Sequence, residues 1–266
     1  MDIHFSCTLC GNCCRDLKLP LTIAEATRWL SDGNDLQIMC EALPWPVEPG
    51  AEDLIAAHRR RRSFPTASGT LPARVIAILA ASFAGFCPYL LSDMKCRIYS
   101  TRPLVCRVYP AEINPFIALL PANKGCPPEA WTPDRPLLLR DGRLMDERIR
   151  KSIATSRDTD EREVEAKGRL CAALRLDSTA MAGEGFVVYS PDRGELLAEL
   201  HRAHEPSDAG AAHAGAAHAG AAGTWRFISN QAATIDALSA LGAVGTLVGA
   251  TDELPFEYLG FKPATV

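Results

Sequence analysis

The spacing of apolar and polar positions changes along the chain between helical and strand periods, and it predicts a mixed α+β protein. The clearest helix signal is the capping box formed by Thr22 and Glu25. Behind it, one helical face carries the apolar residues Ile23, Ala26 and Leu30. Gly33 is a natural stop for a helix. We therefore expect a short helix between Thr22 and Gly33.

Strand-like spacing dominates the region that follows. An irregular, proline-rich stretch contains a short helical piece around Ala51 to Arg60. Next, Arg74 to Phe86 is apolar, carries β-branched side chains and has turn signals at both ends. That pattern favours a buried strand, or a broken hairpin, over a helix. Pro136 to Met145 reads as a hairpin around an Asp141-Gly142 turn, and a helix is expected to start near Asp146.

The second half of the chain carries mostly helical patterns. Thr159 to Leu176 has an acidic first turn and an apolar face, which predicts a helix. Phe186 to Tyr189 reads as a strand, and Ser190-Pro191 is expected to start a helix that runs to about His204. Ser229 to Ala250 is rich in alanine, leucine and valine, but its polar and small side chains leave it too weakly apolar for a membrane span. We expect a packed, glycine-notched helix there.

These patterns divide the sequence into four segments. Residues 1–131 form a small, irregular, cysteine-rich metal-binding domain with short helices and hairpins. Residues 132–205 form a mixed α/β extension, and residues 224–266 a helical C-terminal segment. Between them, residues 206–223 are a low-complexity stretch of alanine, glycine and histidine. We interpret this stretch as a linker rather than as a metal-loading arm built on His213 and His218, because their five-residue spacing alone fixes no ligand geometry.

Composition and charge exclude some classes of function. A net charge of −4 with 23% charged residues describes an ordinary soluble protein, without the basic excess expected of a nucleic-acid-binding protein. The first residues carry neither a basic nor an apolar stretch of the kind found in secretory signals, so we expect a cytoplasmic protein without a membrane partner. Thiols are kept reduced in that compartment. The ten cysteines therefore indicate metal ligation or redox chemistry rather than disulfides.

Four of the cysteines lie within eight residues near the start of the chain. Cys7, Cys10 and Cys13 follow the spacing C-x2-C-x2-C, which lets one tight loop direct successive sulfurs at a single inorganic centre. Cys14 departs from that pattern. In extended backbone Cys13 and Cys14 would point to opposite sides, so Cys14 is expected to serve a second metal or a reactive role. A disulfide knot or four buried thiols are the alternative interpretations.

A second group of four cysteines follows in the middle of the chain: Cys87, Cys96, Cys106 and Cys126. With the first group they make eight candidate metal ligands. Four thiolates around one metal centre leave an excess negative charge of about two units, which nearby arginines could offset. The arginines interleaved with these cysteines are Arg97, Arg102 and Arg107. Cys40 and Cys171 stand apart from both groups and are expected to be core thiols.

The most basic run in the sequence is His58 to Arg62. Such a run could contact phosphates. Arginines at a helix end are more often solvated, or complement the negative end of the helix dipole, and we favour that interpretation here.

The stretches FSCTLCGNCC, CPYL, CRIYSTRPLVCRVYP and CP resemble the YkgJ-type cysteine cluster family, whose CxxCxxCC domain is described as a zinc- or iron-chelating module. The resemblance spans Phe5 to about Pro128, includes all eight grouped cysteines, and says nothing about residues beyond Trp131. Bacterial flagellin lysine methylases look similar over the same motif. That similarity implies, as an alternative, an S-adenosylmethionine-dependent protein lysine methylase-like enzyme, although the sequence shows no strand followed by a glycine-rich turn for such a cofactor.

The predicted function is a metal-cluster-binding protein that uses the eight grouped cysteines. Zinc sites usually take paired C-x2-C units, whereas C-x2-C-x2-C with a remote Cys-Pro ligand is typical of iron-sulfur loops. We therefore favour an iron-sulfur cluster over zinc as the cofactor. A structural zinc-binding interaction module is a further alternative. The sequence assigns no catalytic residue and no protein partner, so an enzymatic role stays open.

Overall fold

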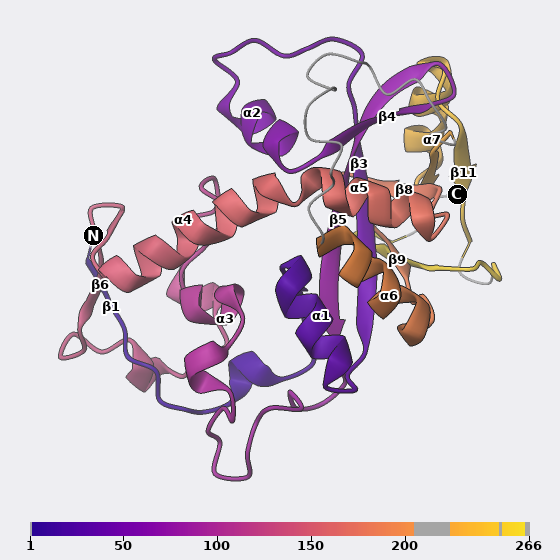
Figure 1. Cartoon of the computed structure of the whole chain (residues 1–266). Coiled ribbons are helices and arrows are strands. Elements are labelled where there is room, and N and C mark those ends of the chain that lie inside the picture. The colour runs from indigo at the N-terminus through magenta and orange to yellow at the C-terminus, as the bar shows by residue number, and fades with distance from the viewer. Residues whose placement is uncertain (1, 205–223, 250–251, 264–266) are drawn as a thin grey trace, which may run out of the picture.

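The computed structural model describes residues 2–204, 224–249 and 252–263. Its largest part is a nine-stranded mixed sheet (Figure 1). The main path of this sheet runs in the order β11 (Gly245–Leu247), β10 (Arg226–Ser229), β8 (Ser178–Met181), β3 (Leu36–Pro44), β5 (Leu71–Ser82) and β2 (Lys18–Leu21). Three strands pair off this path: β4 (Phe64–Ser68) with β5, β9 (Gly185–Tyr189) with β3, and β12 (Glu257–Gly260) with β9. The sheet thus combines strands from both halves of the chain.

The centre of the sheet is the long antiparallel pair of β3 and β5, which are paired over all nine residues of β3. Successive side chains of a strand point to opposite faces. The residues of β5 that face the main core are accordingly alternate ones: Leu71, Ala73, Val75, Ala77, Leu79 and Ala81. This alternation confirms the strand predicted within Arg74 to Phe86, which in the structure begins at Leu71 and ends at Ser82.

Three helices pack together over that face of the sheet: α1 (Ile23–Ser31), α5 (Val164–Ala173) and α6 (Arg193–His204) (Figure 1). The capping box predicted at the start of α1 is confirmed. The Glu25 amide donates to Thr22 Oγ1 at 3.2 Å, and the Thr22 amide donates to Glu25 Oε2 at 3.0 Å. The helix ends before Gly33, which adopts a φ of 85°.

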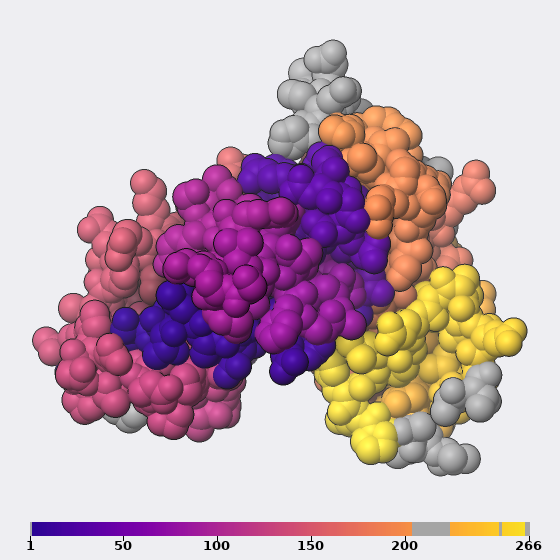
Figure 2. Space-filling model, turned by 90° about the horizontal axis from the view of Figure 1, so that it is seen from below, coloured from indigo at the N-terminus to yellow at the C-terminus, as the bar shows by residue number. Residues whose placement is uncertain are grey.

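The chain around the grouped cysteines has little regular structure. It contains the short helix α3 (Leu104–Val108) and four single 3-10 turns at Asn12–Cys14, Tyr99–Thr101, Pro121–Asn123 and Pro128–Ala130. A small second sheet joins β1 (Asp2–His4) to β6 (Leu137–Arg140) and β7 (Arg143–Leu144), with the predicted Asp141-Gly142 turn between β6 and β7. Helix α4 (Glu147–Arg162), capped by Asp146 as predicted, runs from this small sheet to the large one (Figure 1). Seen from below, residues of the first half of the chain occupy the middle of the surface (Figure 2).

Two expectations about the second half are wrong. The helix predicted over Thr159 to Leu176 is divided, because α4 ends at Arg162 and α5 begins at Val164. The single helix predicted within Ser229 to Ala250 is instead the end of β10, then α7 (Ala232–Ala240), then β11. Gly242, with a φ of 84°, turns the chain after α7. In its described part the C-terminal segment therefore combines three strands with one helix and is not helical throughout.

The remaining secondary structure supports the mixed α+β class. The short helix expected around Ala51 to Arg60 is α2 (Leu54–Arg61). The linker predicted at residues 206–223, with His213 and His218, lies outside the described residues. Across the described residues, no helix combines the length and the apolar character needed to cross a bilayer.

Candidate metal centre

The first cysteine loop turns at Gly11. Its φ of 74° lies in the left-handed region that favours glycine, and the 3-10 turn Asn12–Cys14 follows directly. The Cys14 amide donates to the Gly11 carbonyl at 2.9 Å. The backbone at Cys13 and Cys14 is therefore a tight turn, and the extended backbone predicted there is wrong.

Cys13 and Cys14 interact directly as a result. The Cys13 thiol donates a hydrogen bond to the Cys14 sulfur, which raises the pKa of Cys13 and lowers the pKa of Cys14. Partial burial raises the pKa of Cys13 further. The turn thus places two sulfurs side by side, and Cys14 is the one that ionises more readily.

Three cysteines from the middle of the chain gather beside Cys14. The Cys87 amide donates to the Cys14 carbonyl at 2.7 Å, and a β-bridge between Leu90 and Cys96 folds the chain back next to Cys87. The negative charges of Cys87, Cys106 and Cys96 work to raise the pKa of Cys14, against the larger lowering effect of the Cys13 hydrogen bond. Burial is the main cause that raises the pKa of Cys106 to about 12. These four thiols share one neighbourhood.

Tyr89 ties this neighbourhood to the end of helix α1. Its hydroxyl donates to Asp32 Oδ2 at 2.6 Å, and its ring meets the Trp29 ring edge-on with 5.1 Å between the centroids. Burial and the hydrogen bond to Asp32 raise the pKa of Tyr89. Because Tyr89 is 4% exposed, it anchors the loop that carries Cys87 and Cys96 against the main core.

Cys126 gathers with the other side of the first loop. Asn12 Nδ2 donates to the Gly125 carbonyl at 2.8 Å, which joins the two loops. Burial is the largest cause that raises the pKa of Cys126. The negative charges of three nearby thiols add to that effect: Cys13, Cys10 and Cys7. Cys126 Sγ and the Tyr109 hydroxyl lie 3.6 Å apart and share a hydrogen bond, which works to lower the pKa of Cys126.

Among the three arginines expected to offset thiolate charge, Arg102 lies between the two groups of cysteines. Its positive charge lowers the pKa of both Cys13 and Cys106. Its guanidinium lies 4.0 Å from the centroid of the Tyr99 ring, and its buried Nε has no hydrogen-bond partner within the described residues. A half-buried guanidinium beside several sulfurs fits an anionic thiolate centre.

The other two arginines have different contacts. Arg97 lies over the ring of Tyr89, 5.4 Å from its centroid, and works to lower the pKa of that tyrosine. Arg107 Nε donates to the Arg102 carbonyl at 2.7 Å and so holds the backbone at Arg102.

The two isolated cysteines lie in the main core. Cys40 is fully buried and Cys171 is 1% exposed. A hydrogen bond with Cys171 and burial raise the pKa of Cys40. The prediction that both are core thiols is confirmed.

All eight grouped cysteines are free thiols, and Cys7 is exposed while the other seven are half-buried. Within residues 2–204, 224–249 and 252–263, no three cysteine, histidine or acidic side chains stand in the arrangement of a formed metal site. The structure therefore brings two sets of thiols within electrostatic reach of the first cysteine loop but does not itself define the ligand set of any metal. The donor chemistry fits zinc or an iron-sulfur cluster, because soft thiolates select those metals.

The gathered thiols define a cysteine-rich, metal-chelating class of domain. Residues 6–127 match the CxxCxxCC family, whose description is "Putative zinc- or iron-chelating domain". The match agrees with the YkgJ-type resemblance over the same residues. No curated protein and no solved structure matches the chain.

Sequence reasoning missed two polar contacts of the site, those of Asn12 and Tyr109. Asn12 stands between the motif cysteines, and its contact with Gly125 crosses more than a hundred residues of chain. Tyr109 lies three residues after Cys106, but its role depends on where Cys126 returns in space. Neither contact has a local sequence signal.

The residues of the basic run at the end of α2 differ in their exposure to solvent. Arg59, Arg60 and Arg61 are exposed, as expected for the last turn of a helix. His58 is only 7% exposed, and Arg62 is half-buried and pairs with Asp160. The expectation of a solvated run is therefore wrong for His58 and Arg62.

Proposed function

We propose that this protein binds metal through its eight grouped cysteines, at two neighbouring centres that meet at Cys13 and Cys14. The proposal is supported by the mutual electrostatic effects of free thiols from segments far apart in the sequence, on both sides of the 3-10 turn Asn12–Cys14. The two remaining cysteines lie in the apolar core. A reducing cytoplasmic compartment would keep such thiols available for metal.

The ligand sets that we propose differ from the order of the cysteines along the chain. One centre would use Cys14, Cys87, Cys96 and Cys106. The other would use Cys7, Cys10, Cys13 and Cys126. The backbone contact from Cys87 to Cys14 supports the first set, and the contact from Asn12 to Gly125 supports the second. The thiols that shift one another's pKa fall into the same two sets. Cys13 is the exception, because it also affects the pKa of Cys87 and Cys106. This is expected of a residue that lies between the two proposed centres.

An iron-sulfur cluster is the occupant that we favour. The C-x2-C-x2-C spacing of the first loop and the Cys-Pro ligand at Cys126 are typical of iron-sulfur loops. Such a cluster would supply electron transfer, whereas zinc bound by four thiolates would supply folding energy. The chain's own contribution would be the same for both: Arg102 would offset thiolate charge, and the Tyr109 hydroxyl would donate to Cys126 once that thiol is ionised.

Metal analysis tests the proposal directly. The protein is purified without oxygen, and iron, zinc and acid-labile sulfide are measured per chain. Iron with sulfide is the expected result, and zinc without sulfide would replace the iron-sulfur assignment by a zinc site. A folded preparation that contains none of the three would overturn metal binding altogether.

Paired substitutions test the ligand sets. If Cys7 and Cys126 share a centre, Cys7→Ala/Cys126→Ala should lose no more metal than either single variant, about half of the total. Cys7→Ala/Cys14→Ala should then lose both centres. If the first four cysteines formed one centre and the last four the other, Cys7→Ala/Cys126→Ala would lose both centres and Cys7→Ala/Cys14→Ala only one. That result would contradict our assignment. Cys171→Ala is the matched control, because it removes a thiol from the core and should leave the metal content unchanged.

Removing the metal distinguishes a structural centre from a functional one. If the centre is structural zinc, chelation should unfold the first half of the chain, since metal binding then supplies folding free energy. If the centre is a redox cluster, reversible reduction should change the visible spectrum and leave the circular dichroism signal intact. Loss of helical signal on reduction would argue against an electron-transfer role.

A further inference from the structure

A cavity of about 190 Å³ lies where the β2 edge of the large sheet meets helices α2, α3, α4 and α5. Its lining, drawn from the described residues, contains no cysteine. It shares a wall with α3, which carries Cys106, through Leu104 and Val105. The cavity is therefore a second site, next to the cysteine cluster but built from other side chains.

His58 gives the cavity an unsatisfied polar group. The side chain lines the cavity, is 7% exposed, and its Nε2 has no hydrogen-bond partner within the described residues. The ring packs edge-on against Phe116 with 5.7 Å between the centroids. Burial and the positive charges of Arg62, Arg157 and Arg61 lower the pKa of His58. Leaving a buried polar atom without a partner costs about 1–3 kcal/mol, so a ligand that bonds to it would be favoured.

Arg157 adds a cation that lacks an acidic partner. Its Nε donates to the Ile113 carbonyl at 2.8 Å, and no described acidic side chain forms an ion pair with it. Burial and the charge of Arg61 lower the pKa of Arg157. An anion bound at this guanidinium would relieve both effects.

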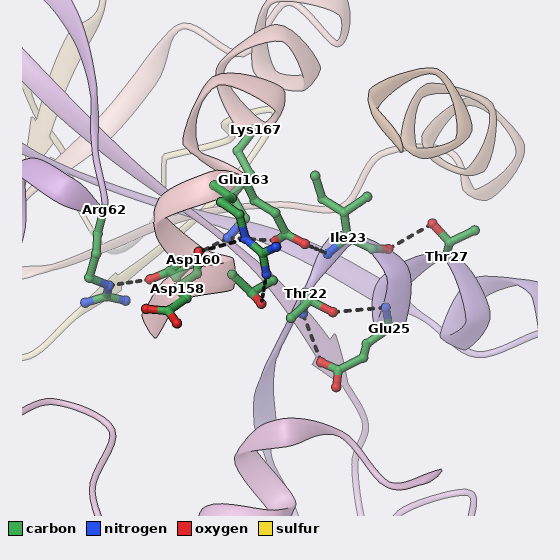
Figure 3. Close-up of polar contacts among 11 residues, drawn as sticks. Thr22, Ile23, Glu25, Thr27, Arg62, Asp158, Asp160, Glu163 and Lys167 are labelled. Atoms are coloured by element: carbon green, nitrogen blue, oxygen red, sulfur yellow. Dashed lines mark hydrogen bonds and ion pairs between the residues drawn. The ribbon is translucent and has the colours of Figure 1, made fainter. Parts of the chain in front are cut away.

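The acidic residues of the cavity are already engaged (Figure 3). Asp160 pairs with Arg62 on one side and with Lys167 on the other, the latter at 2.8 Å. Glu163 Oε1 accepts the Ile23 amide at 2.9 Å, and its other oxygen lies 3.4 Å from Lys167 Nζ. Glu25, the third acidic residue of the lining, accepts the amides of Thr22 and Leu104 and forms no ion pair within the described residues. Among the cations that line the cavity, Arg62 and Lys167 have acidic partners and Arg157 has none within the described residues.

The cavity lining also contains apolar side chains. Among them are Leu21, Ile78, Leu104, Val105 and Ile113. Pockets for drug-sized ligands measure about 300–1,000 Å³, so this smaller space suits a ligand of a few carbon atoms. An inorganic oxyanion would leave these apolar side chains without a partner.

We propose that this cavity binds a small organic carboxylate, with its carboxylate at Arg157 and His58 and its short apolar body against Ile78 and Ile113. The cationic and apolar side chains line one cavity, and together they select that chemistry. This proposal does not depend on metal binding at the cysteines.

The test is calorimetric titration of the full-length protein, as purified with its metal, with acetate, propionate, butyrate and valerate, and separately with inorganic phosphate. Affinity should rise by about fourfold for each added methylene until the cavity is full, because each buried methylene contributes about 0.8 kcal/mol. Phosphate should bind more weakly than butyrate. Arg157→Gln should weaken butyrate binding by about tenfold or more, as expected for loss of a charged hydrogen bond.

Arg148→Gln is the matched control, because Arg148 is also on α4 but its side chain is 94% exposed. Its affinity for butyrate should equal that of the unaltered protein. If Arg157→Gln fails to fold, Ile78→Phe provides a second test, since filling the apolar part of the cavity should weaken valerate more than acetate. The proposal is overturned if no carboxylate saturates at about 10 mM, if Arg157→Gln and Arg148→Gln bind alike, or if phosphate binds best and chain length has no effect.

Discussion

Replacing Lys167 by methionine should destabilise the fold strongly. The Lys167 side chain is 8% exposed and pairs with Asp160 and Glu163, whose side chains are 27% and 15% exposed. Methionine keeps most of the apolar stem but removes the ammonium group that both carboxylates share. Breaking a buried ion pair by removing one partner costs about 3–5 kcal/mol. Because Arg62 still pairs with Asp160, we expect about 3 kcal/mol, equivalent to a fall in melting temperature of roughly 6–12 °C.

The pH dependence of the loss identifies its cause. Burial works to raise the pKa of Asp160, but the charges of Lys167 and Arg62 outweigh it and the pKa lies below its ordinary value. The stability contributed by Asp160 is therefore present above its unfolded pKa and is lost as the pH falls through the lower, folded pKa. For Glu163 burial wins and raises the pKa, so its contribution is present at low pH and is lost as the pH rises through the folded pKa. Without Lys167 both folded pKa values rise, and the destabilisation should be larger at about pH 7 than at about pH 5.

The assay is urea unfolding followed by circular dichroism at both pH values, with metal content measured in each sample. Lys151→Met, on the exposed side of α4, is the control and should change stability by less than about 0.5 kcal/mol. Adding Glu163→Gln to Lys167→Met should recover part of the loss, because it removes the carboxylate that has no other cationic partner, whereas Asp160 keeps Arg62. A loss below about 1 kcal/mol, or one that does not depend on pH, would refute the ion-pair reasoning.

Three further substitutions test single features of the fold. Gly11→Ala should strain the first cysteine loop and lower metal content, because a Cβ at a φ of 74° costs about 1–2 kcal/mol and the Met94 side chain must move to make room for it. Gly142→Ala carries the same backbone strain at a φ of 77°, but in open space and away from the cysteines, and should keep its metal. Equal metal content in the two variants would contradict this. Thr22→Ala should cost about 1 kcal/mol in thermal unfolding through loss of the α1 cap, and a serine at the same position should restore it. Tyr189→Phe should lower the free energy of unfolding by about 1–3 kcal/mol without loss of metal, because the hydroxyl is bonded to both the amide and the carbonyl of Ser178 at 2.8 Å. A metal-depleted variant would contradict this and show that the sheet and the cysteine cluster are coupled.

Local features of this protein could be read from its sequence. The cap of α1, the buried alternation of β5 and the Asp141-Gly142 hairpin each depend on residues within a few positions of one another, so their chemistry is visible in a short window. The exclusion of Cys40 and Cys171 from the cysteine groups is of the same kind, since their isolation in sequence matches their burial in the core. The family match of residues 6–127 is also carried by local motif spacing.

The Ser229 to Ala250 region shows where local pattern fails. β10 and β11 span only four and three residues, which is too short for an alternation that would distinguish them from the α7 helix between them. Their parallel pairing, and the pairing of β10 with β8, decides between strand and helix. That decision depends on neighbours outside the window.

The arrangement of the candidate sites is likewise decided by tertiary structure. The sequence identified eight cysteines, but the grouping of Cys126 with the first loop depends on Asn12 meeting Gly125. The cavity needs His58 on α2 and Arg157 on α4 to face one space, and no local pattern around either residue predicts that they meet. Residue identity and short-range spacing determine which chemistry is available to this protein. Contacts between segments a hundred residues apart determine which groups act together, because only packing of the whole chain fixes the distances between them.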